Sequence, residues 1–267
     1  MANSPIKLSR PANGLATLTL ARPAVYNALD LESMRELQRV TLALAQDPSV
    51  RVVLLQGEGP AFSGGGDISF FATRQADAGA MLEEIGRALN PAILALRQMD
   101  AVVVVSVHGS VAGGSIGLML AGDIIVAAAD TKFNLAYSRM GGSPDAGTSW
   151  FLPRLAGHNA AIELLALSDT FLAERAAQLG LVNHVVAAAE REPFTQRLVD
   201  RLLATPSVTL ANVKRLVTQA QTTPLAAHLE QEIAAYARAC ASPDFREGVA
   251  AFLEKRKPIF NNSTPNP

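Results

Sequence analysis

The stretch His108–Asp123, HGSVAGGSIGLMLAGD, decides the fold of this chain. The β-rich run Val102–Val107 (VVVVSV) leads into it, and an apolar segment from about Ser115 to Ala121 with the character of a short helix follows. Glycines lie between the two, so no side chains cover the backbone where the helix begins. A helix start carries unpaired N–H groups and a partial positive charge. We therefore expect this turn to hold a phosphate or the oxyanion of a polarised carbonyl.

A second glycine-rich turn has the same design. The segment Ala61–Ile68, AFSGGGDI, also follows a hydrophobic run, Val52–Gln56. Each of the two strand-to-helix turns is able to direct one backbone N–H at one oxygen, and two donors aimed at one oxygen form an oxyanion hole. Taken singly, each turn is equally well explained as a tight connection that needs glycine.

Strands and helices alternate through the first half of the chain. An Asn13-Gly14 turn predicts a hairpin between strands near 6–10 and 15–20, and Asp30 is the expected N-cap of the helix that follows. Further strands are expected at 50–56, 102–107 and 124–128, with a helix at about 79–99. This alternation predicts an α/β fold with non-local strand pairing.

The second half of the chain is predicted to be mostly helical. Helices are expected at about 148–155, 158–167, 173–179, 190–204, 209–221, 225–240 and 243–254. A short extended piece at 181–186 is the exception, and residues 133–147, rich in glycine, are expected to be irregular.

Composition limits the function classes. The chain has 267 residues, 49% of them hydrophobic and 18% charged, with a net charge of −1, so nothing favours electrostatic binding of nucleic acid. Cys240 is the one cysteine, which excludes an intrachain disulfide, and the four histidines lack metal-ligand spacing. The sequence has neither a signal-peptide pattern nor an apolar run long enough for a membrane span, so we expect a cytoplasmic protein.

Four landmarks in order resemble the enoyl-CoA hydratase/isomerase, or crotonase, family. They are ARPAVYNALD at 21–30, AFSGGGDI at 61–68, HGSVAGGSIGLMLAGD at 108–123 and FLEKRKPIF at 252–260, and the resemblance runs from about Ile6 to Phe260. It implies a crotonase-type spiral of ββα turns over residues 1–200, with the CoA and oxyanion site. It also implies a helical C-terminal trimerisation region at 201–267 and a homotrimer or hexamer, with no membrane partner.

The resemblance also implies a set of site residues. Gly66 and Gly114 would donate the two N–H groups to a thioester oxygen and stabilise the enolate. Coenzyme A would be part of the substrate, with no separate cofactor and no metal. The remaining residues implied in binding substrate or CoA are Arg22, Val25, Ala61, Gly64, Gly65, Asp67, Ile68, Tyr137, Lys257 and Phe260. The last two would approach the adenine end, from the same subunit or a neighbour.

The chain departs from the family pattern at the acid/base positions. Typical hydratases of the family that this chain resembles carry two glutamates. The matching positions in this sequence are Gly117 and Tyr137. One carboxylate lies nearby, Asp145, at a place where family members with an acidic residue resemble enoyl-CoA isomerases. We therefore expect Asp145 to shuttle the proton, with a pKa raised by an apolar setting. Its alternative role is to cap a helix beginning near Ala146, and Tyr137 would either line the acyl pocket or donate a hydrogen bond.

Several other functions remain open at this point. Without the two glutamates the chain is also compatible with a hydratase that uses a different acid/base set, or with a CoA-thioester binding protein without activity. A chlorobenzoyl-CoA dehalogenase would use Asp145 as its nucleophile, and is expected to have tryptophan in place of Tyr137. Finally, residues 113–117 match G-x-S-x-G, which would make Ser115 the nucleophile of an α/β-hydrolase. The strand that precedes Ser115 ends too early for that arrangement.

Overall fold

In the computed structural model, which describes residues 4–11, 13–72 and 77–260, six strands form the main sheet in the order β1-β2-β3-β4-β6-β9. The strands are β1 (Ile6–Ser9), β2 (Leu15–Leu20), β3 (Val52–Gly57), β4 (Val102–Val107), β6 (Ile124–Ala128) and β9 (His184–Val186). The first two pair antiparallel, as the predicted hairpin requires, and every later pairing is parallel. The predicted α/β fold with non-local strand pairing is confirmed.

Helices cover both faces of this sheet, which explains why β4 is apolar at nearly every position. Val103 and Val105 belong to the large core that includes residues of α1 (Leu31–Ala45) and α3 (Ala78–Gln98). The alternate residues Val102 and Val104 are also buried, and Val104 packs with Val199 of α8 (Arg191–Leu203) on the other face. A strand buried on both sides loses the alternating pattern and becomes a continuous hydrophobic run.

The start of α1 follows its sequence closely. Asp30 is the N-cap, and its carboxylate accepts a hydrogen bond from the backbone N–H of Ser33 at 2.8 Å. This bond satisfies one of the N–H groups that a helix start leaves unpaired. The predicted cap is therefore confirmed.

A second, smaller sheet is formed by short strands that the sequence did not predict, the first of them just before α4 (Gly114–Leu120). Its strands, in the order β5-β7-β8, are β5 (Ser110–Ala112), β7 (Lys132–Asn134) and β8 (Phe171–Leu172). Strands of two or three residues are too short to show any periodicity, so the sequence does not reveal them. A bridge between Ser63 and Val111 joins this sheet to the first glycine turn.

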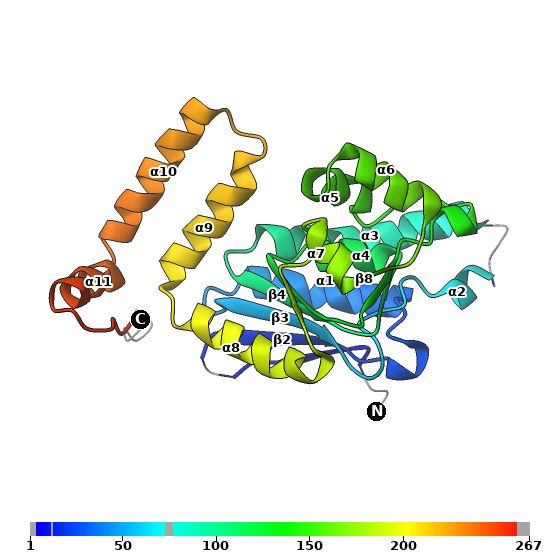
Figure 1. Ribbon diagram of the computed structural model, residues 1–267, viewed down its shortest axis with the longest axis horizontal. Coiled ribbons are helices and arrows are strands. Elements are labelled where there is room, and N and C mark those ends of the chain that lie inside the picture. The colour runs from blue at the N-terminus through cyan, green and yellow to red at the C-terminus, as the bar shows by residue number, and fades with distance from the viewer. Residues whose placement is uncertain (1–3, 12, 73–76, 261–267) are drawn as a thin grey trace.

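The C-terminal half is helical, as predicted. The helices are α5 (Thr148–Leu155), α6 (His158–Leu167), α7 (Ala173–Gln178), α9 (Ser207–Ala220), α10 (Leu225–Cys240) and α11 (Pro243–Leu253). Helix α8 packs on the main sheet, whereas α9, α10 and α11 project from the body of the chain (Figure 1). Among the described residues, no helix has the length and apolarity to cross a bilayer.

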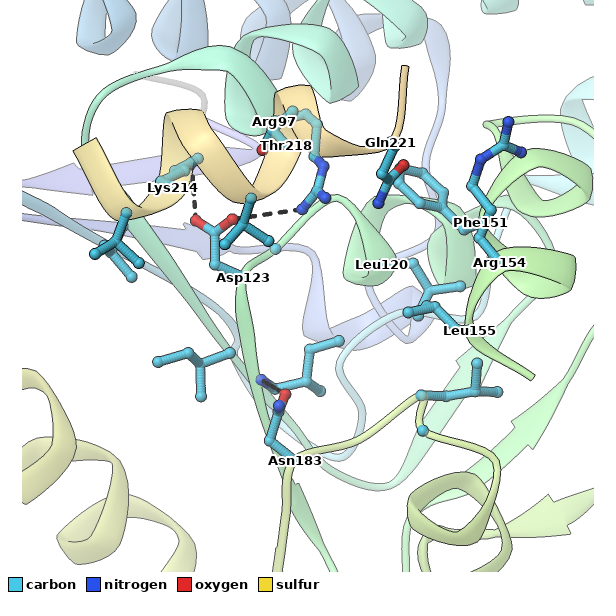
Figure 2. Close-up of a pocket in the computed structure, with 18 of the residues that line it drawn as sticks. Arg97, Leu120, Asp123, Phe151, Arg154, Leu155, Asn183, Lys214, Thr218 and Gln221 are labelled. Carbon is cyan, nitrogen blue, oxygen red and sulfur yellow. Dashed lines mark hydrogen bonds and ion pairs between the residues drawn. The ribbon is translucent and has the colours of Figure 1, made fainter. Parts of the chain in front are cut away.

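Lys214 ties the projecting helices to the core. Its ammonium donates to the carbonyl oxygens of Leu96 at 2.7 Å and Ala101 at 2.8 Å, and lies 2.8 Å from a carboxylate oxygen of Asp123. Figure 2 shows Lys214 and Arg97 on either side of that carboxylate. Asp123 also accepts from Val103 N at 2.8 Å, so it holds a strand end, as expected from the sequence. Burial lowers the pKa of Lys214, and the nearby Asp123 opposes that shift.

Candidate active site

The two glycine turns lie against each other. Ser63 N donates to Ser110 O, and Ala112 N donates to Ser63 O, each at 3.1 Å. Gly65 has a φ of +90°, and a Cβ placed on it would lie only 2.6 Å from Ala112 O. Only glycine permits both this backbone conformation and this close approach. The fold thus brings together the two turns that the sequence identified separately.

The N–H groups of Gly66 and Gly114 are available to a ligand. Gly66 forms a bridge with Leu29 in which both hydrogen bonds are made by its neighbours: Leu29 N donates to Gly65 O, and Asp67 N donates to Leu29 O. The N–H of Gly66 itself therefore points to the other side of the segment. Gly114 is the first residue of α4, where N–H groups have no partner inside the helix. In the part of the chain that the structure describes, neither N–H has an acceptor.

Ser115 has a structural role. It is fully buried, its hydroxyl donates to Ala112 O at 2.7 Å, and the same oxygen accepts from Ala112 N at 3.0 Å. A nucleophile elbow exposes its serine at the top of a sharp turn. This buried, internally bonded hydroxyl does not fit that geometry, so the match to G-x-S-x-G is incidental.

Asp145 lies directly beside the second turn. Its Oδ1 is 3.0 Å from the position that a Cβ on Gly114 would take, and Tyr137 Oη donates to the same oxygen at 2.6 Å. Burial raises the pKa of Asp145, and the hydrogen bond from Tyr137 opposes the rise. The pKa of Tyr137 is also raised, by burial and then by the charge of Asp145. The raised pKa of Asp145 and the hydrogen bond donated by Tyr137 both agree with what the sequence suggested.

The side chain of Asp145 does not cap a helix. Helix α5 begins at Thr148, with Gly147 as its N-cap residue and no side-chain capping bond. The backbone carbonyl of Asp145 instead accepts from Thr148 N and Thr148 Oγ1, both at 2.9 Å. The alternative that the carboxylate caps a helix near Ala146 is therefore wrong, because the helix begins two residues later.

Gly117 has no room for a side chain. A Cβ at this position would lie 2.0 Å from the carbonyl oxygen of Ala146. Ala146 is itself buried and has a backbone φ of +50°. The backbone that follows Asp145 thus occupies the space beside α4 where a residue-117 side chain would extend. This packing explains physically why the chain has glycine here, and it excludes a second carboxylate at residue 117.

The remaining residues near the first turn form a connected surface with the 3-10 helix η1 (Pro23–Val25). Arg22 donates to Ala28 O at 2.6 Å and pairs with Asp30 at 3.0 Å and with Asp67 at 3.6 Å. Val25 and Ile68 are exposed, and Gly64 N donates to Tyr26 O at 2.8 Å. Ala61 differs from these because its side chain is buried at 1% exposure.

Asn27 is a site residue that the sequence reasoning missed. It is buried with a φ of +53°, and its amide donates to the carbonyl oxygens of Glu58 and Ala61, both at 2.8 Å. Its side-chain oxygen accepts from Arg22 N at 2.8 Å. Asn27 therefore clamps the first glycine turn against η1. Asparagine tolerates the left-handed conformation better than most residues, and this preference is the one signal that the sequence offered.

Lys257 and Phe260 lie far from these residues. Phe260 packs on α11, with a ring carbon 3.5 Å from the Cβ position of Gly248. Helix α11 and α2 (Ile68–Ala72) are at opposite ends of the molecule in Figure 1. A single chain therefore does not bring the two predicted adenine contacts to the site around Gly114 and Asp145.

A cavity of about 420 Å³ lies elsewhere, between α9, α5 and the start of β6 (Figure 2). Arg97, Asp123 and Lys214 contribute to its wall together with many apolar side chains. Gly66, Gly114, Tyr137 and Asp145 are not among its lining residues. In this wall the charges of Lys214 and Asp123 are paired with each other. The described residues also contain no cluster of three or more acidic, histidine or cysteine side chains suited to a metal ion.

Comparison with known proteins decides the family. The family model for enoyl-CoA hydratase/isomerase matches residues 10–263. This chain belongs to the enoyl-CoA hydratase/isomerase family. A 1,2-epoxyphenylacetyl-CoA isomerase of Escherichia coli K12 is 34% identical over 95% of this chain and 97% of its own. A crotonyl-CoA hydratase of Syntrophomonas wolfei is 31% identical over 92% and 94%, respectively.

A solved structure confirms the fold of this family member. An enoyl-CoA hydratase from Polaromonas sp. JS666 superposes with a TM-score of 0.88 and 32% identity, covering 95% of this chain and 98% of that one. The crotonase fold with a helical C-terminal region, which the resemblance implied, is therefore confirmed. The names of the relatives include both isomerases and hydratases, so family membership by itself does not decide between the two reactions.

Proposed function

We propose that this enoyl-CoA hydratase/isomerase family member shifts a C=C double bond of an enoyl-CoA by proton transfer through Asp145. The observation that supports this most directly is the position of Asp145, whose Oδ1 is 3.0 Å from the Cβ position of Gly114 and 2.6 Å from Tyr137 Oη. One carboxyl group with a raised pKa thus lies beside the unpaired N–H of an α4 residue. A base next to an oxyanion site is the arrangement that enolate chemistry needs.

The reaction would proceed in two proton transfers. The thioester oxygen binds to the N–H groups of Gly66 and Gly114. Asp145 takes a proton from C2 of a 3-enoyl thioester, and the electrons of that C–H bond enter a dienolate whose negative charge lies on the bound oxygen. Asp145 then returns the proton to C4, which gives the 2-enoyl product. The proton is neither gained nor lost overall, so one carboxyl group is sufficient.

Hydration makes a different demand on the site. Adding water to a 2-enoyl thioester needs one group to activate the water and another to handle the proton at C2. At residue 117 a second carboxylate is excluded by the Ala146 carbonyl, and at residue 137 the side chain is a tyrosine bonded to Asp145. These two features favour isomerisation over hydration.

A panel of thioesters tests the proposed reaction. We expect 3-hexenoyl-CoA, or a ring-derived analogue, to be isomerised at least about a hundredfold faster than crotonyl-CoA is hydrated, since hydration lacks a second acid/base group. Product mass and NMR distinguish the two reactions. Brisk hydration of crotonyl-CoA would contradict the proposal, as would chloride release from chlorobenzoyl-CoA with no isomerisation. Absence of turnover on the whole panel would favour a binding protein without activity.

We also propose that the active species is a trimer or a dimer of trimers. Large apolar side chains are exposed on the projecting helices, including Leu225 at 73%, Ile233 at 64% and Phe252 at 83%. Such an apolar surface is typical of a protein interface. A neighbouring copy would also be the source of Lys257 and Phe260 at the CoA site. Light scattering should therefore give a trimeric or hexameric mass at micromolar concentration, and a monomeric mass would contradict this assembly.

A further inference from the structure

Asp145 and Tyr137 are both anchored through their backbones. Two groups of Thr148 donate to the carbonyl oxygen of Asp145 at 2.9 Å. The carbonyl oxygen of Tyr137 accepts from Met140 N at 3.1 Å and from Gly142 N at 2.9 Å. These contacts hold the two main-chain segments in place, so the distance between the tyrosine hydroxyl and the carboxyl group is set before any substrate binds.

The hydrogen bond between the two side chains engages one carboxyl oxygen. Tyr137 Oη is 2.6 Å from Asp145 Oδ1, a length typical of a hydroxyl that donates to a charged carboxylate. The same Oδ1 is the oxygen beside the Cβ position of Gly114. Thr148 Oγ1 also lies 3.4 Å from Tyr137 Oη. Oδ1 is thus held by the protein.

On the basis of the function proposed above, we infer that Tyr137 is a positioning residue that holds Oδ1 of Asp145 and so presents Oδ2 to the substrate. The C2–H bond breaks, the proton goes to Oδ2, and the electron pair enters the dienolate. The same proton then forms the new C4–H bond. Tyr137 keeps its own proton throughout, because its part is to orient the carboxyl group and to stabilise its charged form.

The surroundings of Asp145 make the positioning role of Tyr137 measurable through the pH dependence of the rate. Burial raises the pKa of Asp145 and the hydrogen bond from Tyr137 lowers it, with no charged side chain among the causes. The packed elements contribute Gly114 and Gly117 from α4 and Thr148 from α5, none of which titrates at these pH values. Removing the hydroxyl should therefore raise the pKa of Asp145 further. Since the carboxylate must be ionised to accept the proton, the acidic limb of the rate profile should move to higher pH.

The first test is Tyr137→Phe, which deletes the hydroxyl and keeps the ring. We expect kcat for 3-enoyl-CoA isomerisation to fall about tenfold or more, and the acidic limb to move up by about one pH unit. KM should change much less than kcat, because the hydroxyl does not bind the thioester. Tyr236→Phe is the matched control, since Tyr236 is 67% exposed on α10; with an unchanged mass by light scattering it should leave the limb in place.

A second variant keeps the proposal testable if Tyr137→Phe does not fold. Incorporating 3-fluorotyrosine at position 137 retains the ring and supplies a more acidic, stronger donor. The proposal expects near-normal kcat and a limb displaced to lower pH than in the unmodified enzyme. A folded Tyr137→Phe with normal kcat and an unmoved limb would overturn the inference, as would an unmoved limb in the fluorotyrosine enzyme. A loss confined to KM would assign Tyr137 to substrate binding instead.

The failure of this inference is distinguishable from failure of the proposed function. If Asp145→Asn is inactive while both Tyr137 variants behave like the unmodified enzyme, proton transfer by Asp145 is supported and the positioning role of Tyr137 is excluded. If Asp145→Asn isomerises 3-enoyl-CoA at the normal rate, the proposed function itself falls.

Discussion

Asp145→Asn should stop isomerisation of 3-enoyl-CoA, with a loss of about a hundred- to ten-thousandfold or more in kcat. An amide is close in size to the carboxyl group, but it does not take up a proton from C2 and return it to C4. Tyr137 can still donate to the amide oxygen, so the local hydrogen bond at 2.6 Å has a replacement partner. The variant should therefore remain folded. Steady-state kinetics with 3-hexenoyl-CoA measure the loss directly.

The controls for Asp145→Asn separate chemistry from binding. Asp169→Asn removes the same charge from an exposed side chain that pairs with Arg139 at the surface, and it should retain activity. Binding of a saturated acyl-CoA, measured by calorimetry, should be nearly unchanged in Asp145→Asn because the carboxyl group acts on the proton. Brisk turnover by Asp145→Asn would remove Asp145 from the mechanism and the isomerase assignment with it.

Gly114→Pro should reduce turnover by about a hundred- to thousandfold, because proline has no N–H to donate to the thioester oxygen. Gly114 is the first residue of α4, where proline is well tolerated by the helix backbone. The preceding Gly113 has a φ of +52°, outside the helical region that a following proline disfavours. Thioester binding should suffer less than turnover, since the donor acts most strongly on the oxyanion of the transition state.

Gly114→Ala is the matched control for the proline variant. A Cβ at this position lies 3.0 Å from Asp145 Oδ1 in either variant, so both add a similar steric contact. Only alanine keeps the N–H, and the difference in kcat between the two variants isolates the donor. Circular dichroism must be unchanged in both. A folded Gly114→Pro enzyme with the activity of Gly114→Ala would exclude Gly114 N–H from catalysis.

Local patterns in the sequence were sufficient for much of this molecule. The β-rich run at 102–107 specified a strand, and the Asp30 cap placed the start of α1. Glycine at 65 and 114 marked the backbone positions where two turns form beside the candidate site. These features depend on neighbours within a few residues, so the order of side chains along the chain is enough to determine them.

The tertiary structure alone decided how these parts combine. Only packing between distant segments brings the Ala146 carbonyl to within 2.0 Å of a Gly117 Cβ, brings Tyr137 Oη to Asp145, or sets Asn27 against the first turn. The strands β5, β7 and β8 likewise exist through pairing with each other and are too short to show a period. Such contacts depend on which residues the fold places side by side, a property that the local order of residues does not contain. The chemistry of the site depends on these contacts because they set the pKa of Asp145 and exclude a second carboxylate.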